Sequence, residues 1–417
     1  MRRSAGSAPS LRHLPFFERL ASVEEQSPEG RHATAGLLIL RLIDHWELAG
    51  PQIVAPESVS VRAVRAAIMA LPTGDAIREC LLGIVNTMQT LREMDVQPVL
   101  PRLFAYAQLL ERRAEHALAE DVYVTIASRA VEEFETDLLV DAHLRTGFCR
   151  RTLGRFREAE EAYQRAGVVA KRHGEPQRAL RSRVGLAIVA SQVGNLPKSH
   201  DMFVGIIDDA KESGFPALAA ECMHTLATVI YKQGFPVRAL RMATESLRHL
   251  DDAIEMERVL GTIGALLIAL ERYTTARDTL LVVEATAVSE EMRRTARHAL
   301  MTVAARAGDR EEFDRTFRLA DAQPVGAENQ ANFFIESARG FRRFGELARA
   351  AEQLSLGRLF AETHGLNRSV FEIESMEAEL ERERAAAAAE AEADATVATG
   401  LPEIEREIYQ FASARGR

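Results

Sequence analysis

The sequence predicts an all-α protein, a right-handed α-solenoid built from antiparallel helix pairs. A turn-forming position recurs seven times at nearly constant spacing, small and bulky side chains follow it at fixed distances, and a second glycine recurs in phase with it. A fixed period of this length is typical of stacked supersecondary units, in which each unit contacts only its neighbours. Such an array can reach 417 residues without exceeding the size limit of one hydrophobic core.

The turn position is the clearest of these signals. Successive copies lie 40, 40, 40, 37, 37 and 37 residues apart, and most of them are glycine. Glycine accepts a positive φ at a helix C-terminus without a Cβ penalty, which predicts a tight turn between two helices. The turn positions are Ala114, Gly154, Gly194, Gly234, Glu271, Gly308 and Gly345.

Two further positions predict how the helices pack. Five residues after the turn come mostly small side chains, which let antiparallel helices approach closely, and nine residues after it come mostly bulky ones, which fill the space between pairs. The small positions are Ala119, Ala159, Ser199, Ala239, Ala276, Phe313 and Ala350. The bulky positions are Tyr123, Tyr163, Phe203, Ala243, Leu280, Phe317 and Leu354. Because Phe313 occupies a small position, we expect the sixth copy to be degraded.

A second glycine ends the second helix of three units. It closes the segments Ala170–Gly174, Ala210–Gly214 and Ala361–Gly365, each time 20 residues after a turn glycine. Pro176 and Pro216 follow two of these glycines and prevent the helix from continuing. Each unit is therefore predicted to be a helix, a tight turn, a second helix and a glycine stop.

With these units in place, the chain resembles the tetratricopeptide repeat (TPR) family. The resemblance covers roughly residues 97–366 and is strongest at Leu153–Ala159 and at Ala162 and Tyr163. Family repeats are usually about 34 residues long, so copies of 37 and 40 residues are long. The longer type resembles the helical-repeat sensor regions of some bacterial transcription activators and peptide-responsive regulators. The resemblance implies a scaffold that binds a protein or a peptide.

The N-terminal residues do not follow the repeat. Residues 1–30 are rich in Ser, Gly, Pro and charge, and they are predicted to be disordered or loosely attached, with Leu14–Phe17 docking locally. Residues 31–96 are predicted to form N-terminal helices that include a divergent first repeat, since Gly74 falls 40 residues before Ala114. The expected helices run from Thr34 to Trp46, from Ser58 or Ser60 to Ala70, and from Thr73 to Met94.

Two helices are expected after the repeats. Residues 367–396 predict a capping helix, started by Asn367 or Ser369, that runs into an Ala/Glu-rich exposed helix. Residues 397–417 predict a short C-terminal amphipathic helix. This last helix either packs on the body as a terminal cap or engages a groove of its own chain or of a partner. Its apolar positions are Leu401, Ile404, Ile408 and Phe411.

Composition bears on compartment and partners. Cys80, Cys149 and Cys222 lie far apart and form no disulfide framework or metal-ligand spacing, which favours a reducing, cytoplasmic environment. The most apolar stretch, residues 35–43, is too short to span a bilayer, and no apolar run follows the N-terminal arginines. The sequence therefore predicts neither a membrane segment nor a targeting segment.

The net charge of −9 is unevenly distributed. Residues from Glu372 onward carry −7, which leaves −2 for the rest of the chain, and residues 145–183 form a basic stretch. This stretch is either a phosphate-binding surface or a consequence of the general use of arginine, 48 residues against 4 lysines. No nucleic-acid motif or interleaved aromatic residues accompany it, so the sequence disfavours a nucleic-acid partner.

No motif for catalysis is present. The sequence contains no phosphate-binding Gly-rich loop with Lys, no two-His metalloprotease helix, no paired-Cys spacing and no nucleophile elbow. We therefore predict a non-enzymatic protein that needs no cofactor and no metal. An enzyme whose site is assembled from distant residues remains a third hypothesis, because such a site leaves no local motif.

Candidate binding residues follow from the resemblance. In the TPR fold the first helix of each unit lines the concave face, and residues ten, six and three positions before the turn share one face of that helix. This face mixes aromatic and aliphatic side chains with a few polar ones, which suits an extended peptide or an amphipathic helix. The candidate partner-binding residues are Phe104, Gln108, Leu144, Phe148, Arg151, Ile188, His224, Thr228, Tyr231, His298, Arg339 and Arg342.

The function predicted from these observations is a cytoplasmic scaffold or adaptor that holds a peptide or helix of a partner protein in the concave groove. Some relatives bind a C-terminal carboxylate through a Lys and Asn clamp, but Leu144, Phe148 and Gly185 occupy the corresponding positions and disfavour such a clamp. The alternative is a regulatory sensor module that responds to a peptide or small ligand. No DNA-binding helix-turn-helix is evident in residues 1–100, which argues against a complete transcription regulator.

Overall fold

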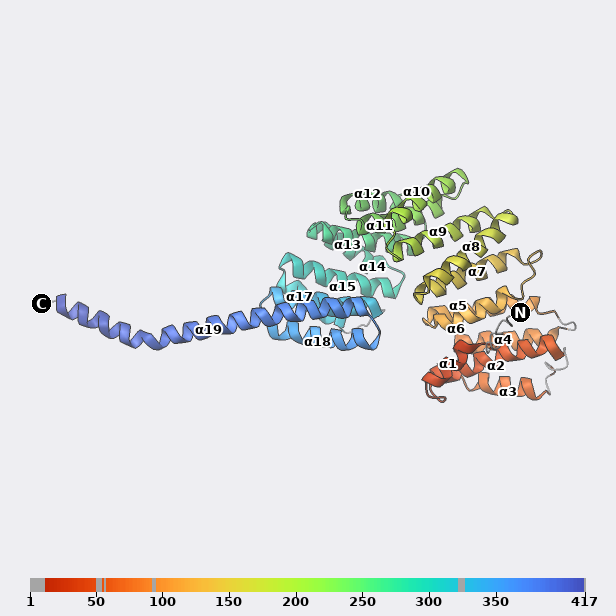
Figure 1. Cartoon of the computed structure of the whole chain (residues 1–417), viewed down its shortest axis with the longest axis horizontal. Coiled ribbons are helices and arrows are strands. Elements are labelled where there is room, and N and C mark those ends of the chain that lie inside the picture. The colour runs from red at the N-terminus through yellow and green to blue at the C-terminus, as the bar shows by residue number, and fades with distance from the viewer. Residues whose placement is uncertain (1–11, 50–54, 56–57, 92–94, 322–326, 416–417) are drawn as a thin grey trace, which may run out of the picture. The chain divides into compact units, whose positions relative to one another are not determined.

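A computed structural model describes residues 12–49, 55, 58–91, 95–321 and 327–415 (Figure 1). Within these ranges every regular element is a helix. The chain divides into two compact units, Met1–Cys222 (unit 1) and Met223–Arg417 (unit 2), and the division falls inside one helix. The all-α class predicted from the periodicity is confirmed.

In its described residues, unit 1 begins with four helices and continues as repeated helix pairs. The first-helix and second-helix members of the pairs are α5 with α6, α7 with α8, and α9 with α10. The helices are α1 (Leu14–Ser22), α2 (Pro28–Ala49), α3 (Val59–Met69), α4 (Ala76–Thr90), the 3-10 turn η2 (Gln97–Val99), α5 (Leu100–Arg112), α6 (His116–Ala127), α7 (Thr136–Thr152), α8 (Phe156–Arg172), α9 (Pro176–Gln192) and α10 (Leu196–Glu212).

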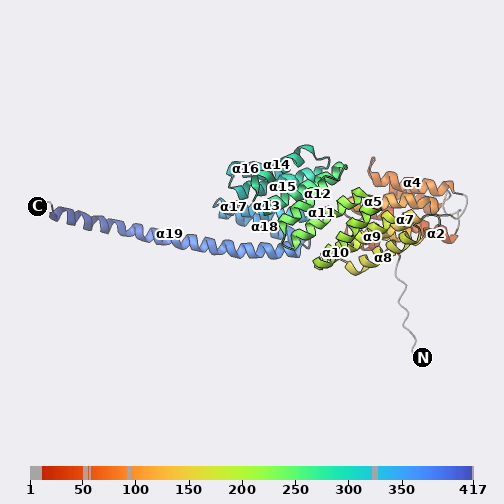
Figure 2. The ribbon, with the colours of Figure 1, turned by 90° about the horizontal axis from the view of Figure 1, so that it is seen from above.

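Unit 2 continues the same arrangement of pairs and ends in one long helix. The helix α11 (Pro216–Lys232) contains the division between the units and pairs in sequence with α12. The remaining helices are α12 (Pro236–Leu247), α13 (Ala253–Ala269), α14 (Tyr273–Thr286), α15 (Glu290–Ala307), α16 (Arg310–Asp321), α17 (Ala327–Arg343), α18 (Leu347–Thr363) and α19 (Asn367–Arg415). Figure 2 shows α19 extending well past the helices it packs against.

All seven predicted turn positions have a positive φ, including the two that are not glycine. At Gly154 the backbone N–H donates to Arg151 O at 3.1 Å, and the next N–H donates to Arg150 O at 2.8 Å. These paired bonds satisfy the last carbonyls of α7, as in a Schellman motif. The same pair of bonds forms at Glu271, whose φ is 57°. The position in the repeat therefore decides the backbone conformation even where the residue type does not favour it.

We expect Glu271→Gly to stabilise unit 2 by about 1 kcal/mol, because a residue with a Cβ is strained in the left-handed region. Glu271 is exposed and makes no ion pair among the described residues, so its side chain adds little to offset this strain. The matched control is Glu271→Ala, which removes the same charge and keeps the Cβ. Urea unfolding followed by circular dichroism measures both changes, and equal midpoints for the two variants would contradict the backbone explanation.

The predicted packing positions are confirmed by burial. Ala119, Ala159, Ala239 and Ala276 are fully buried, as close helix approach requires. The bulky position is also filled as expected, because Tyr163 inserts its ring between neighbouring first helices, against the backbone of α7 and α9 at two glycines.

The expectation that the sixth copy is degraded needs correction at Phe313. The Phe313 ring is fully buried and lies directly over Gly340 in α17, where any Cβ would overlap it. The missing side chain on α17 therefore compensates for the bulky one on α16. At Phe313 this copy is packed without a gap between α16 and α17.

The N-terminal segment is more ordered than its composition predicted. Residues 14–22 form α1, Phe16 is fully buried, and α2 begins at Pro28 and not near Thr34. The early start of α2 has a local cause. Ser27 caps the helix, since its Oγ accepts a hydrogen bond from Gly30 N at 3.0 Å, and Pro28 occupies the first turn. Residues 1–11 of the predicted loose segment lie outside the described residues.

Two predicted helix boundaries in residues 31–96 also change. Ser58 caps α3 as expected, accepting a bond from Val61 N at 3.2 Å. The following helix, however, is capped by Asp75 and not by Thr73, because Asp75 Oδ1 accepts from Ile77 N at 2.8 Å. That helix, α4, ends at Thr90, four residues before the expected end.

The predicted break before residue 397 is wrong, since α19 runs without interruption to Arg415. Pro402 lies inside this helix and removes one backbone hydrogen bond, but the alanine-rich stretch before it has a high helix propensity.

The first turns of α19 pack on α17 and α18, with Ile373 and Leu380 buried. The last turns are different, because Leu401, Ile404, Ile408 and Phe411 are all exposed. Docking of this segment as a cap on the body is therefore excluded in this structure.

Candidate functional site

The first-helix face of unit 1 carries the aromatic candidates. The helices α5, α7 and α9 follow one another in the stack, and α7 contacts both of its neighbours (Figure 1). Each candidate side chain on these helices is half-buried, with part of its surface open to solvent. They are Phe104, Gln108, Leu144, Phe148, Arg151 and Ile188. We call this set and the polar groups that bridge it the unit 1 face.

Phe148 is the centre of the unit 1 face. Two guanidinium groups lie over its ring, those of Arg145 and Arg151, at 5.1 and 5.3 Å from the ring centroid. The His116 ring approaches it edge-on at 5.8 Å. An aromatic ring with two cations over it presents both an apolar surface and hydrogen-bond donors. These are the two kinds of contact that recognition of a peptide requires.

Polar bridges connect the first helices across this face. Arg145 Nε donates to Glu111 Oε1 at 3.0 Å, and Arg151 Nη1 donates to Gln192 Oε1 at 3.3 Å. Arg145 and Gln192 were not predicted from the sequence, since both fall outside the pattern of positions ten, six and three before the turn. A signal was present, because Arg145 lies one helical turn before Phe148 and therefore on the same side of α7.

Cys149 lies beneath this face and is not a reactive group. Its side chain is fully buried, and burial raises the pKa of the thiol to about 12. The thiolate is the nucleophilic form of cysteine, so this thiol is inert at neutral pH.

Unit 2 carries three further candidates on its first helix. His224 is hydrogen-bonded to Thr262 Oγ1 of α13 at 2.7 Å, and burial lowers its pKa to about 4. The imidazole is therefore neutral at pH 7. Thr228 is half-buried, and Tyr231 exposes 45% of its surface, which makes it the most accessible candidate on α11.

His298 needs correction, because it lies in the interior of unit 2. Its ring packs on Phe333 with 4.9 Å between centroids, and burial lowers the pKa of the imidazole. The periodicity placed His298 on the expected side of α15, but the Phe333 ring of α17 packs on that position. A partner cannot reach it in this structure.

Arg339 and Arg342 are engaged by α19. Arg339 Nη2 lies 2.7 Å from Glu372, and Arg342 Nη1 lies 2.7 Å from Glu379. Glu383 also pairs with Arg342 and, with Glu379, raises the pKa of that guanidinium. The repeat pattern gave no sign of these contacts, since α19 is not part of any repeat.

The basic stretch at 145–183 consists largely of links between helices. Arg150 Nε bonds to Glu120 at 2.7 Å, and Arg178 Nε bonds to Asp141 at 3.0 Å. Arg172 similarly pairs with Glu132 at 2.5 Å. These pairs neutralise the positive charge locally, so the run of arginines in the sequence does not correspond to an unpaired basic surface.

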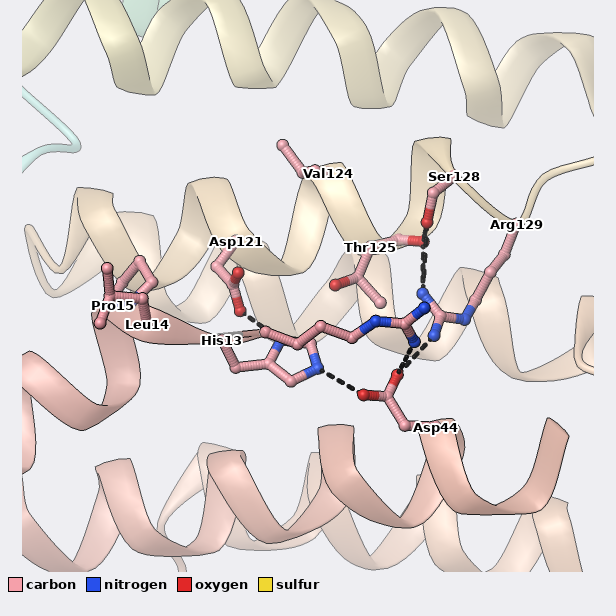
Figure 3. Close-up of a pocket in the computed structure, with 10 residues that line it drawn as sticks. His13, Leu14, Pro15, Asp44, Asp121, Val124, Thr125, Ser128 and Arg129 are labelled. Atoms are coloured by element: carbon pink, nitrogen blue, oxygen red, sulfur yellow. Dashed lines mark hydrogen bonds and ion pairs between the residues drawn. The ribbon is translucent and has the colours of Figure 1, made fainter. Parts of the chain in front are cut away.

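A polar cavity of about 620 Å³ lies near the start of α1, between α2 and α6 (Figure 3). His13 is buried in its wall, with Nδ1 2.7 Å from Asp121 and Nε2 3.3 Å from Asp44. Arg129 approaches Asp44 at 2.6 Å and Arg12 approaches it at 3.3 Å. Because these charges oppose one another in pairs, the cluster connects three helices and presents no uncompensated charge to a ligand.

Among the described residues, neither a metal-binding cluster nor a membrane-spanning helix is found. No group of three or more His, Cys, Asp or Glu side chains in the described ranges is arranged to hold a metal ion, and this includes the His13 cluster. Where the helices are described, none combines the length and apolar character that crossing a bilayer requires.

Tandem helix pairs with positive-φ turns and interlocking small and bulky side chains give this chain a tetratricopeptide-like helical repeat fold. Comparison with known proteins supports this class at the level of the fold. The sequence matches no family model and no curated protein.

Solved structures with this fold cover most of the chain. The Rap conjugation gene regulator of the plasmid pLS20, solved in complex with the Phr* peptide, is 11% identical over 81% of this chain and 98% of its own, with a TM-score of 0.54. The apo form of the quorum sensor NprR from B. thuringiensis is 12% identical over 77% of this chain and 97% of its own, with a TM-score of 0.52. A Rap protein complexed with competence and sporulation factor is 10% identical over 83% and 99%, with a TM-score of 0.50.

Proposed function

We propose that the chain is a non-enzymatic scaffold that holds a peptide or helical segment of a partner protein in its concave groove. The observation that carries the proposal is the unit 1 face, where the half-buried ring of Phe148 in α7 has two guanidinium groups of the same helix over it. An apolar ring flanked by donors suits an amphipathic segment better than a small polar metabolite. That a structure of similar fold was solved with a bound peptide agrees with this proposal.

The test is capture of a partner from a lysate by the tagged chain. Phe148→Ala should reduce the recovery of a defined protein, identified by mass spectrometry, because large aromatic side chains dominate interface energies. Tyr231→Ala tests the accessible residue on α11 in the same way. Phe134→Ala is the matched control, since Phe134 is 86% exposed and lies between α6 and α7, outside the unit 1 face. Equal recovery by the Phe148 and Phe134 variants would contradict the proposal.

A second candidate function is a regulatory sensor whose ligand is a short peptide or small molecule. It is favoured by the similarity in fold to a quorum sensor and to a conjugation regulator. The same experiment separates the two, because a sensor should elute with a low-mass peptide and not with a protein. Adding that peptide to the purified chain should then change its radius of gyration in small-angle scattering.

A further inference from the structure

A second cavity, in unit 2, is rich in arginine. It has a volume of about 360 Å³ and lies between the C-terminal ends of α15 and α17. Its lining contains four guanidinium groups and one carboxylate, so arginine predominates among the lining side chains. The lining residues are Ala305, Arg306, Glu336, Arg339, Arg342 and Arg343. We call this the arginine cavity.

The arginines converge on the cavity because of where the helices end. Arg306 is in the last turn of α15, and Arg342 and Arg343 are in the last turn of α17. Cations at a helix C-terminus complement the helix dipole, which explains one arginine in each helix. The helix dipole does not explain why arginines from two helices line the same cavity, since like charges that lie close together repel one another.

The walls of the cavity already bind carboxylates within the chain. Glu379 and Glu383 of α19 occupy Arg342, whose Nε lies 3.0 Å from both carboxylate oxygens of Glu383. Glu372 occupies Arg339. Planar, two-point contact of this kind is the geometry in which a guanidinium group recognises a carboxylate.

Two guanidinium groups of the cavity are left with little acidic contact. Arg306 approaches Glu336 at 3.5 Å, a distance at which the pair is weak. Arg343 is exposed, and within the described ranges it makes neither an ion pair nor a side-chain hydrogen bond. Unlike Arg339 and Arg342, these two side chains are therefore available to a carboxylate from outside the chain.

We propose that the arginine cavity binds the carboxylate side chains of an acidic segment in the partner, with Arg306 and Arg343 as the contacting groups. The inference rests on the proposed function, because it specifies the charge of the segment that the scaffold holds. The glutamates of α19 pair with Arg339 and Arg342 and leave Arg306 and Arg343 for the partner. The part of the partner that meets the arginine cavity is thus acidic.

The test uses a fluorescein-labelled peptide of twelve glutamates and fluorescence anisotropy with the full chain at low salt. Arg306→Gln with Arg343→Gln should weaken binding by about tenfold or more, because hydrogen bonds to charged groups are lost. Arg382→Gln is the matched control, since Arg382 is an exposed arginine of the same unit outside the cavity. Raising the salt concentration should weaken binding to the unaltered chain. A peptide of twelve glutamines should not bind.

Equal affinity for the double variant and the Arg382 control would overturn the proposal. So would displacement of the peptide by inorganic phosphate at concentrations below those at which free glutamate displaces it, because the cavity would then be a phosphate site. The peptide-binding test and the partner-capture test of the proposed function can fail independently of each other. Loss of partner capture in the Phe148 variant does not involve this peptide, and peptide binding through Arg306 and Arg343 does not require Phe148.

Discussion

Replacement of Asp44 by asparagine is expected to destabilise unit 1 by about 3–5 kcal/mol, the usual cost of removing one partner from a buried ion pair. The carboxylate is only 6% exposed and meets three cationic or potentially cationic groups. Asparagine has the same shape but no charge. The substitution therefore isolates the electrostatic contribution from packing.

The cost arises mainly at Arg129. Its side chain is 10% exposed and lies 2.6 Å from Asp44, so the guanidinium group loses its counter-charge where water cannot replace it (Figure 3). Thr125 O and Ser128 Oγ still accept bonds from Arg129 Nη1 at 3.2 Å, but neither group is charged. His13 retains Asp121 as a partner.

The chain provides its own probe and control for this experiment. Trp46 is the single tryptophan, it is 1% exposed, and it lies in α2 two residues after Asp44, so its fluorescence follows the unfolding of unit 1 in urea. Arg12→Gln removes a different partner of the same carboxylate. Because Arg12 is 66% exposed, that change should cost less than about 1 kcal/mol. Similar losses for the two variants would show that the cluster is not a buried network.

A second variant checks the same interpretation from the other direction. When Asp44→Asn is combined with Arg129→Met, the uncompensated charge is removed together with its partner. We expect the double variant to recover part of the loss, since an apolar pair often replaces a buried ion pair without a penalty. A double variant less stable than Asp44→Asn alone would contradict this mechanism.

Periodicity predicted the repeats well because it reports on packing that every unit shares. Ala114 and Glu271 are poor turn formers, yet their place in the repeat predicted a positive φ correctly. Each unit must bury the same face against its neighbour, so the position in the unit outweighs the preference of a single residue. Phe313 wrongly indicated a degraded copy because the residue that compensates for it, Gly340, lies in another copy of the repeat.

The regions outside the repeats depend on contacts that no period records. His13 joins residues 31 and 108 positions away in the sequence, and it does so from a left-handed conformation with φ of 60°. Arg342 meets glutamates 37 and 41 positions away. Composition assigned residues 1–30 to a loose segment, although Ser27 followed by proline is a helix-start signal that local sequence contains. The candidate site was predicted best where it lies on repeat helices, as at Phe148, and worst where α17 or α19 covers it.

Substitution of Gly185 by alanine should destabilise unit 1 by about 1–2 kcal/mol, although alanine is the better helix former. The Tyr163 ring of α8 lies against the backbone of α9 at Gly185 and against that of α7 at Gly147, where a Cβ would come within 2.8 Å of the ring. At Gly185 the overlap is more severe. The ring is 5% exposed and enclosed by both helices, so it cannot move aside without opening the stack.

Gly205→Ala is the control for helix propensity. Gly205 is also inside a helix, α10, but the nearest atom to its Cβ position is a side-chain nitrogen of Arg183 at an ordinary 3.6 Å. That substitution should stabilise unit 1 by about 0.5–1 kcal/mol, since no side chain has to move. The two glycines thus separate the two effects of adding a methyl group, the gain in helix propensity and the steric overlap.

Removing the ring should reverse the sign of the effect at Gly185. Tyr163→Ala alone leaves a cavity and is expected to cost about 3–5 kcal/mol, by analogy with other large aromatic side chains. In that background Gly185→Ala no longer meets the ring, so it should stabilise unit 1 as Gly205→Ala does. Urea unfolding followed by Trp46 fluorescence gives the stability of the four proteins in this double-mutant cycle, which are the unaltered chain, the two single variants and the double variant. If Gly185→Ala remained destabilising without the ring, the strain would lie in α9 itself, and the interlocking of bulky side chains with bare helix backbone would not be what sets the spacing of these repeats.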